Sequence, residues 1–519
     1  MASRVSDGMH ARKDALMHCR SLTVALTMLV AATTAMGQAG DLTDGVRRLI
    51  SSHKWGEAKV GVSVVDVTSG TTLASVRGDE PFVPASNMKL LTSGAALMIL
   101  GPDFVFKTKL VLKDGVLVVK GDGDPSLADP ELLEKMEPRM TVADMLAALT
   151  TATTQAGVTK LDALIVDDRV FDRVLVHPRW PADQLSRPYC AEVSGVNFHA
   201  NVLHVFPGPS PSGPGHPAVY SLQPPAPWLT MEVRSRTVAE GNNAAWISRD
   251  EKGRTFTLRG DIRHKALSPI EVTYHEPAGF VANLLATELG KAGVDIPSSN
   301  VRIAKDGADP EADVALTEGR VIAVVSTPID EVLRRCNTDS MNLYAEALMK
   351  RMGHAVTHEP GSWTNGSTVL RMILTEKVGP GAAASTIISD GSGMSRDNGV
   401  CPSTFTRWLC SMAADPKLAD IYADSLAEVG TGTLRKRFRD AKLRNHLQAK
   451  SGYISGVRTL SGYLTDAASG RKVAFSVMVN NIKVDSAHTA ALELHEEVVQ
   501  LADKWLTQRA GTPPLKSGG

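Results

Sequence analysis

The sequence contains little cysteine and no excess of either charge. Five Cys in 519 residues are too few for a dense disulfide framework, and no CxxC or Cys/His spacing predicts a zinc site. Cys401 and Cys410 could pair in an oxidising compartment, but free buried thiols are the expected state. Lys+Arg and Asp+Glu both number 56, so charge gives no reason to expect nucleic acid or an anionic surface as a partner.

The N-terminus has the order of a secretory signal. Basic residues come first, an apolar run covers 22–32, and small residues follow: Arg4, Arg12, Lys13 and Arg20, then Ala35, Gly37 and Ala39. This order predicts a signal peptide over residues 1–39, and hence a secreted or periplasmic protein with no transmembrane segment in its mature form. The alternative is an uncleaved anchor, but the apolar run is shorter than the roughly 20 residues that span a bilayer.

The length allows two or three domains, and 43% hydrophobic residues can fill a sizeable core. Antiparallel strands can join in one sheet although they are far apart in sequence. We therefore expect an α+β catalytic domain, an antiparallel sheet flanked by helices, made of the two segments 40–124 and 316–508. Residues 125–315 would be an inserted accessory part of mixed strands and helices. Residues 207–227 would be an exposed loop rich in Pro and Gly, and 509–519 a flexible tail.

The stretch VPASNMKLLTSGAALMIL, residues 83–100, places Ser86 and Lys89 three positions apart at the start of an apolar run. On a helix these two side chains share a face, and the N–H groups of the helix start point at charge near the Ser oxygen. Burial would lower the pKa of the Lys89 amine and make it a base toward the Ser86 hydroxyl. The spacing alone is weak, since Ser51 and Lys54 repeat it. The plain alternative is that Ser86 caps the helix and Lys89 is solvated.

Two further short motifs fall in matching contexts. Ser340-Met341-Asn342 opens a predicted helix, where the hydroxyl could relay a proton and the amide could hold a substrate carbonyl. Lys450-Ser451-Gly452 lies in a predicted strand, where the cation and hydroxyl could bind a carboxylate and Gly leaves room for an extended peptide. Each motif has a decoy, at 298–300 and 516–518, in a loop-like or tail context. The ordered set SxxK, SxN and KSG is a strong signal where each part is weak.

This ordered set resembles the signature of penicillin-binding proteins and serine β-lactamases. More closely, the chain resembles the D-alanyl-D-alanine carboxypeptidase/endopeptidase family of low-molecular-mass (class C) penicillin-binding proteins. Other matching stretches, spread over most of the chain from about 45 to 500, are PASNMKLLTSGAAL, KGDGDPSL, NFHANVLHVFPG, SDGSGMSRDN, GTGTLRKRF and AKSGYISGVRTLSGYL. The resemblance implies a β-lactamase/transpeptidase-like fold with a long mixed β/α insertion between SxxK and SxN.

The resemblance also implies roles for individual residues. Ser86 would be the acylated nucleophile and Lys89 its base. Ser340 and Asn342 would complete the proton relay and the substrate clamp.

The third motif would bind the end of the substrate. Lys450 and Ser451, beside Gly452, would hold the terminal carboxylate, and the backbone N–H groups of Ser86 and Tyr453 would form the oxyanion hole. Two positions depart from the family pattern, since Ser451 replaces the usual Thr and Tyr453 replaces a small hydroxyl residue. Arg396 in SDGSGMSRDN could meet a carboxylate on the side chain of a stem peptide, or form a surface salt bridge.

The sequence therefore predicts a serine-type D-Ala-D-Ala carboxypeptidase, and leaves open whether it is also a DD-endopeptidase. It would act on peptidoglycan stem peptides, be acylated by β-lactams, and need no metal or cofactor. One alternative is a serine β-lactamase-like hydrolase that shares Ser86 and Lys89, which the long insertion and the lack of an evident deacylating Glu loop disfavour. Another is a non-catalytic peptidoglycan-binding protein that retains the fold, which the intact motifs disfavour.

Overall fold

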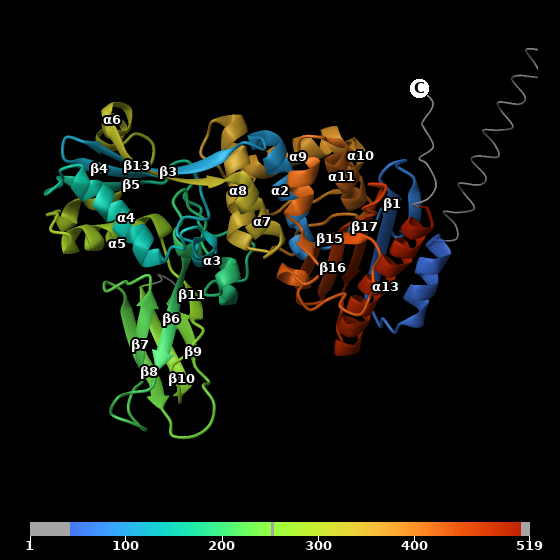
Figure 1. Cartoon of the computed structure of the whole chain (residues 1–519), viewed down its shortest axis with the longest axis horizontal. Coiled ribbons are helices and arrows are strands. Elements are labelled where there is room, and N and C mark those ends of the chain that lie inside the picture. The colour runs from blue at the N-terminus through green and yellow to red at the C-terminus, as the bar shows by residue number, and fades with distance from the viewer. Residues whose placement is uncertain (1–41, 251–253, 510–519) are drawn as a thin grey trace, which may run out of the picture.

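The computed structural model describes residues 42–250 and 254–509. The predicted signal peptide, 1–39, and the predicted tail beyond residue 509 lie outside this part of the chain. Figure 1 shows an elongated molecule with a six-stranded sheet and its helices at one end and a second sheet-and-helix body at the other, from which a β-rich part extends. In the described residues, no helix is both long and apolar enough to cross a membrane.

The six-stranded sheet joins strands from both ends of the chain. Its order is β14-β15-β16-β17-β1-β2, and all of its pairs are antiparallel. β1 pairs with β17 from Lys59 opposite Asn480 to Asp66 opposite Val473. The strands are β1 (Lys59–Asp66), β2 (Thr72–Val76), β14 (Ala427–Glu428), β15 (His446–Ile454), β16 (Val457–Thr465) and β17 (Lys472–Asn480).

Helices cover both faces of this sheet. α13 (Asp485–Arg509) and the helical residues 42–52 enclose one apolar core with it. On the other face α2 (Met88–Leu100) is buried over most of its length and apolar nearly all round, as expected of a core helix. Around it lie α7 (Ile329–Asn337), α8 (Asn342–Thr357), α9 (Trp363–Val378), α10 (Pro380–Ser385), α11 (Pro402–Ala414) and α12 (Ala419–Asp424). The sheet and α2 thus form a rigid support for residues at the start of α2.

The second body is built on a five-stranded sheet of order β12-β5-β4-β3-β13. Its strands are β3 (Val105–Lys113), β4 (Val116–Lys120), β5 (Ala163–Asp167), β12 (Val301–Ile303) and β13 (Arg320–Pro328). α4 (Val142–Gln155) and α5 (Pro277–Lys291) pack on one face, α6 (Pro310–Glu318) packs on the other, and α3 (Pro130–Lys135) is a short helix beside them. The domain boundaries at 124 and 316 stay a prediction. Because β3, β4 and β13 belong to this sheet, we propose boundaries nearer residues 101 and 329.

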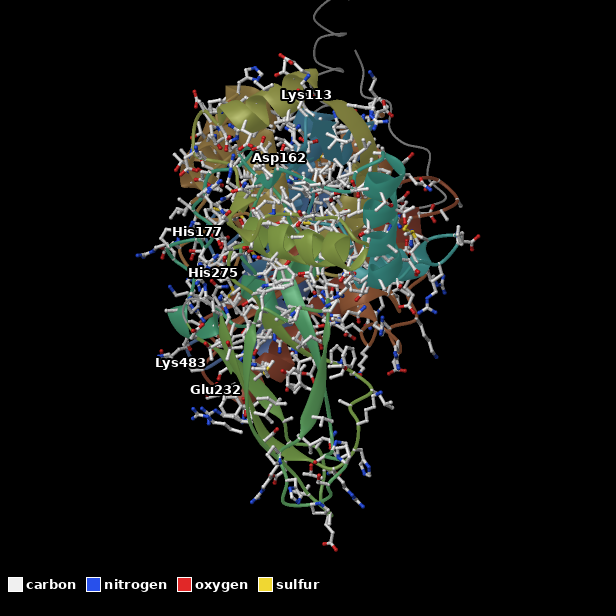
Figure 2. The ribbon with its side chains drawn as sticks, turned by 90° about the vertical axis from the view of Figure 1, so that its left-hand side faces the viewer. Lys113, Asp162, His177, Glu232, His275 and Lys483 are labelled. Atoms are coloured by element: carbon white, nitrogen blue, oxygen red, sulfur yellow. The ribbon has the colours of Figure 1, made fainter. Side chains whose placement is uncertain are left out.

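Two three-stranded sheets, β8-β10-β9 and β11-β6-β7, form the β-rich part. Their strands are β6 (Val202–Gly208), β7 (Val219–Gln223), β8 (Thr230–Thr237), β9 (Trp246–Arg249), β10 (Thr255–Ile262) and β11 (Ile270–Thr273). In Figure 2, Glu232 on this part lies well below Lys113 and Asp162 of the five-stranded sheet. The prediction of a loop over 207–227 is wrong where β7 pairs with β6. β7 is an edge strand, and edge strands tolerate flanking Pro.

The four cysteines of the described chain, Cys190, Cys336, Cys401 and Cys410, are free thiols. Burial raises the pKa of Cys336 to about 12 and that of Cys410 to about 11. The thiols of Cys336 and Cys410 are therefore protonated and unreactive at neutral pH.

Candidate active site

Ser86 lies in the 3-10 turn η1 (Ala85–Asn87), which leads directly into α2. Ala85 has a left-handed backbone with φ of 46°, a conformation that a non-Gly residue keeps only where its surroundings hold it. One such contact is the hydrogen bond that Thr459 Oγ1 of β16 donates to the Pro84 carbonyl at 2.9 Å. The turn is thereby fixed against the sheet, and Ser86 is held half-buried at the junction.

Lys89 follows Ser86 by one helical turn, and its side chain is 0% exposed. Its Nζ donates to Ser86 Oγ at 3.1 Å, to Asn342 Oδ1 at 2.6 Å and to the Ser392 carbonyl at 3.0 Å. Burial lowers the pKa of Lys89 from 10.5 to about 8, although nearby acidic side chains oppose this shift. An amine with this pKa is partly neutral at pH 7. It also stands within hydrogen-bond distance of a hydroxyl, as a general base must.

Ser340 and Asn342 bring the second motif to the same place. Ser340 has φ of 65°, and Asn342 is the first residue of α8, which packs on α2. Ser340 Oγ accepts a hydrogen bond from Lys450 Nζ at 2.8 Å. Burial, reinforced by the positive charge of Lys89, lowers the pKa of Lys450 well below its usual value. Two hydroxyl–amine pairs, Ser86 with Lys89 and Ser340 with Lys450, therefore lie together.

The third motif lies on β15, directly beside the Ser86 backbone. A Cβ on Gly452 would stand 3.0 Å from the Ser86 nitrogen and 2.2 Å from Thr459 Oγ1, so only glycine permits this approach. Tyr453, the next residue of the strand, is thus brought close to the nucleophile's own amide. Its ring is 56% exposed and packs on the guanidinium of Arg458, whose Cζ lies 3.9 Å from the ring centre.

Asn87, which sequence reasoning missed, ties η1 to β15 and β16. Its side chain is 0% exposed. The amide nitrogen donates to the Lys450 carbonyl at 2.8 Å, and the amide oxygen accepts from Ser461 Oγ at 2.6 Å. Ser451, half-buried at the next position of β15, offers its carbonyl to Lys450 Nζ at 2.8 Å. No local pattern singles out Asn87, because its partners come from the other end of the chain.

Glu346 on α8 holds the wall of the site beside Lys89. Its carboxylate is 0% exposed and accepts hydrogen bonds from the backbone N–H groups of Gly391 and Ser392, both at 2.8 Å. Ser392 is the residue whose carbonyl accepts from Lys89. Burial, reinforced by the charge of a second buried carboxylate, raises the pKa of Glu346 to about 7. Sequence reasoning missed this residue, because its backbone partners at 391–392 lie far along the chain.

The second buried carboxylate, Asp390, organises the same loop. It accepts from the N–H of Gly393 at 2.8 Å and from the indole of Trp180 at 2.9 Å. Gly393 has φ of 83°, and a Cβ there would stand 1.8 Å from the Ala85 carbonyl oxygen. The loop therefore touches the turn that carries the nucleophile, which only glycine at this position allows.

Arg396 lies exposed at the rim of the site, where its guanidinium donates to the Ser455 carbonyl. Within residues 42–250 and 254–509 no carboxylate forms an ion pair with it, so the alternative of a surface salt bridge is not found there. Arg396 lines a cavity of about 710 Å³. The same cavity is lined by Ser86 of the first motif, by Ser340 and Asn342 of the second, and by Tyr453, the residue that follows the third.

The insertion supplies the opposite wall of this cavity, through a segment at 178–189. Asn342 Nδ2 donates to the Tyr189 carbonyl at 2.8 Å, and Arg179 forms an ion pair with Asp397. His177, labelled in Figure 2, precedes the segment and packs edge-on against Trp363 with ring centres 5.0 Å apart. Sequence reasoning missed this wall, because the segment carries no recognisable motif.

The sequence model of the D-Ala-D-Ala carboxypeptidase 3 (S13) family matches residues 42–504. The D-alanyl-D-alanine carboxypeptidase of Actinomadura sp. (strain R39) is 30% identical over 87% of this chain and 84% of that protein. The D-alanyl-D-alanine carboxypeptidase DacB of Haemophilus influenzae is 24% identical over 82% of this chain and 85% of that protein.

A solved structure shares the fold. The crystal structure of penicillin binding protein 4 (dacB) from Haemophilus influenzae matches with a TM-score of 0.68 and 20% sequence identity. The match covers 89% of this chain and 99% of that chain. The expected α+β fold, an antiparallel sheet flanked by helices with a long insertion, is confirmed.

Proposed function

The chain belongs to the D-Ala-D-Ala carboxypeptidase 3 (S13) family, and from that membership we propose which of its residues carry out the reaction. It is a serine-type D-Ala-D-Ala carboxypeptidase, which hydrolyses peptidoglycan stem peptides through an acyl-enzyme and is acylated by penicillins. The observation that carries the residue assignment is the fully buried Lys89 amine, 3.1 Å from Ser86 Oγ, with a lowered pKa.

In the acylation step, Ser86 Oγ attacks the carbonyl carbon of the terminal D-Ala–D-Ala bond and Lys89 Nζ takes its proton. Negative charge develops on the carbonyl oxygen. The backbone N–H groups of Ser86 and Tyr453 are the proposed donors to it, and the close approach of Gly452 to Ser86 supports this pairing. A single donor of this kind contributes about 3 kcal/mol to the transition state.

The tetrahedral intermediate then releases D-Ala. Ser340, whose hydroxyl accepts a hydrogen bond from Lys450 Nζ, is the proposed relay that passes the proton from Lys89 to the leaving nitrogen as the carbon–nitrogen bond breaks. Lys450 and Ser451 hold the carboxylate of the departing residue, and Asn342 holds the peptide on the acyl side. Water next attacks the ester carbon, and Ser86 regains its proton as the shortened stem peptide leaves.

A β-lactam follows the same first step. Ring opening leaves the amine tethered to the acyl group, so the leaving group does not diffuse away and the ester on Ser86 persists. We also propose that the enzyme cleaves D-amino cross-links as a DD-endopeptidase, because the 710 Å³ cavity is walled by the insertion and exceeds what one terminal D-Ala requires. The proposed location is secreted or periplasmic, as the N-terminal sequence predicts.

The test is covalent labelling by a fluorescent penicillin together with D-Ala release from a pentapeptide. Wild-type protein should label and release D-Ala, and Ser86→Ala should do neither. Ser51→Ala is the matched control, because Ser51 has the same spacing to a Lys but lies outside the cavity, and it should behave like wild type. Equal labelling of Ser86→Ala and wild type would contradict the assignment. Cleavage of a cross-linked dimer of stem peptides tests the endopeptidase activity. Rapid turnover of nitrocefin would favour the alternative of a β-lactamase.

A further inference from the structure

A second cavity, of about 840 Å³, lies between the five-stranded sheet and the helices of the catalytic part. We call it the lysine cavity, after Lys107, Lys109 and Lys120 in its lining. His354 of α8 lines the side that faces the catalytic part. His354 follows Asn342 by twelve residues along α8, which corresponds to roughly 18 Å. The lysine cavity is therefore separate from the cavity that contains Ser86, and its volume is typical of a ligand site.

The five-stranded sheet is covered over only part of this face. α6 packs on one half, where Val118, Ala163 and Ile165 are buried beneath it. Beyond α6 the same face carries lysines instead of apolar residues, because Lys107 and Lys109 alternate with buried residues along β3, and Lys120 follows Val118 by two positions on β4. The end of the sheet that α6 leaves open thus carries three lysines, with Asp167 opposite Lys120.

The lysines are placed against one another. Lys109 and Lys120 are direct partners across the β3–β4 pair, an arrangement in which like charges destabilise a sheet. On its other side, across β4–β5, Lys120 lies directly opposite Asp167. Lys107 stands two positions away on the same face. Among residues 42–250 and 254–509, no carboxylate forms an ion pair with any of these three ammonium groups.

Every acidic residue that lines the cavity forms an ion pair, although Arg169 is shared by two of them. Each lining carboxylate has a cationic partner within 3.0 Å: Asp122 with Arg351, Asp167 and Asp313 with Arg169, Asp172 with Lys350, and Asp306 with Arg173. The cavity therefore combines ion-paired carboxylates with three ammonium groups that form no ion pair within the described residues. Such a surface is stabilised by a ligand that brings negative charge.

We propose that the lysine cavity binds an oxyanion ligand that carries two or more phosphate or carboxylate groups. Two adjacent groups would bridge Lys109 and Lys120, and the cavity has room for the chain or ring that bears them. Ammonium–oxyanion hydrogen bonds are charge-assisted and strong. At the surface they are screened by salt, so binding should weaken as ionic strength rises.

The test measures binding of inorganic pyrophosphate and of citrate to the full chain by calorimetry at low salt. The cavity variant is Lys109→Met/Lys120→Met, and the matched control is Lys265→Met/Lys436→Met, which removes the same charge from two exposed lysines elsewhere. We expect wild type and control to bind alike and the cavity variant to bind about tenfold more weakly or not at all. If only pyrophosphate binds, the ligand carries phosphate groups, and if only citrate binds, it carries carboxylates. Binding of both shows that the site recognises the oxyanion chemistry that they share.

A second measurement separates a site from a structural role. Without ligand, the cavity variant should melt close to the wild-type temperature, because loss of the repulsion between Lys109 and Lys120 offsets loss of the attraction between Lys120 and Asp167. D-Ala release from a soluble pentapeptide should be unchanged in both variants. The proposal is overturned if neither anion binds wild type at low salt, if both variants lose binding equally, or if the cavity variant binds as tightly as wild type.

Discussion

The titration of Lys89 gives the sharpest test of the site. With a pKa of about 8, about one amine in ten is neutral at pH 7 and about nine in ten at pH 9. A solvated lysine of pKa 10.5 would be neutral in about three molecules in ten thousand at pH 7. Burial therefore raises the population of the base by about 300-fold, equivalent to roughly 3 kcal/mol of the acylation barrier.

The measurement is the second-order rate of acylation by a fluorescent penicillin, at concentrations far below saturation, between pH 6 and 9.5. This rate reports the ionisation of the free enzyme. Because the neutral amine is the active form, the rate should rise with pH, by about tenfold from pH 7 to a plateau above pH 9. Ser86→Ala at each pH measures labelling at other residues.

Stability supplies an independent check with its own sign. The pKa of Lys89 is lower in the folded than in the unfolded chain, so between about pH 8 and 10.5 the unfolded state binds more protons. The free energy of unfolding should therefore rise across this interval relative to Lys89→Met, which lacks the titrating group. A pH-independent acylation rate, or a rate that still rises about tenfold per pH unit at pH 9.5, would refute the reasoning, since the base would then be another group or a solvated amine.

Four substitutions extend the test. Glu346→Gln replaces one carboxylate oxygen, which accepts from a backbone N–H of residues 391–392, with an amide group that donates instead. The acylation rate, measured by labelling kinetics, should fall about tenfold, and the melting temperature should fall by several degrees. Gly452→Ala forces a Cβ against the Ser86 nitrogen, and the acylation rate should fall about 100-fold in a protein that still folds by circular dichroism. Tyr453→Ala keeps the backbone N–H, so acylation should stay within about threefold of wild type; a 100-fold loss would show that the ring itself is required. Lys450→Met removes the cation that is proposed to bind the substrate carboxylate. The KM for a pentapeptide should therefore rise by a larger factor than the KM for the same peptide amidated at its C-terminus.

The motif residues were found from sequence because their chemistry is local. SxxK needs only one helical turn, and KSG needs only a strand, so spacing and context predict both. The convergence of Ser86, Lys89, Ser340 and Lys450 in one place was expected, and the hydrogen bonds among them agree. Their catalytic roles stay predictions, as does that of Arg396 at the rim.

What the sequence did not reveal depends on contacts between distant segments. Asn87 gains its importance from Ser461, and Glu346 gains its importance from the backbone of residues 391–392. A buried Glu on a helix has no periodic signature that separates it from a solvated one. The hairpin at 105–120 alternates like the strands around it, so its pattern predicts a strand but not which sheet the strand joins.

The hydrogen bond from Asn342 to the Tyr189 carbonyl has a practical consequence for protein engineering. Excising the insertion to obtain a minimal enzyme would remove two hydrogen-bond partners. These are the Tyr189 carbonyl, which accepts from Asn342 Nδ2, and the Trp180 indole, which donates to Asp390. The protein without the insertion would keep Ser86 but lose contacts that hold the surrounding residues in place. The insertion thus supplies hydrogen-bond partners to the candidate active site, and a smaller protein would need replacement partners for both groups.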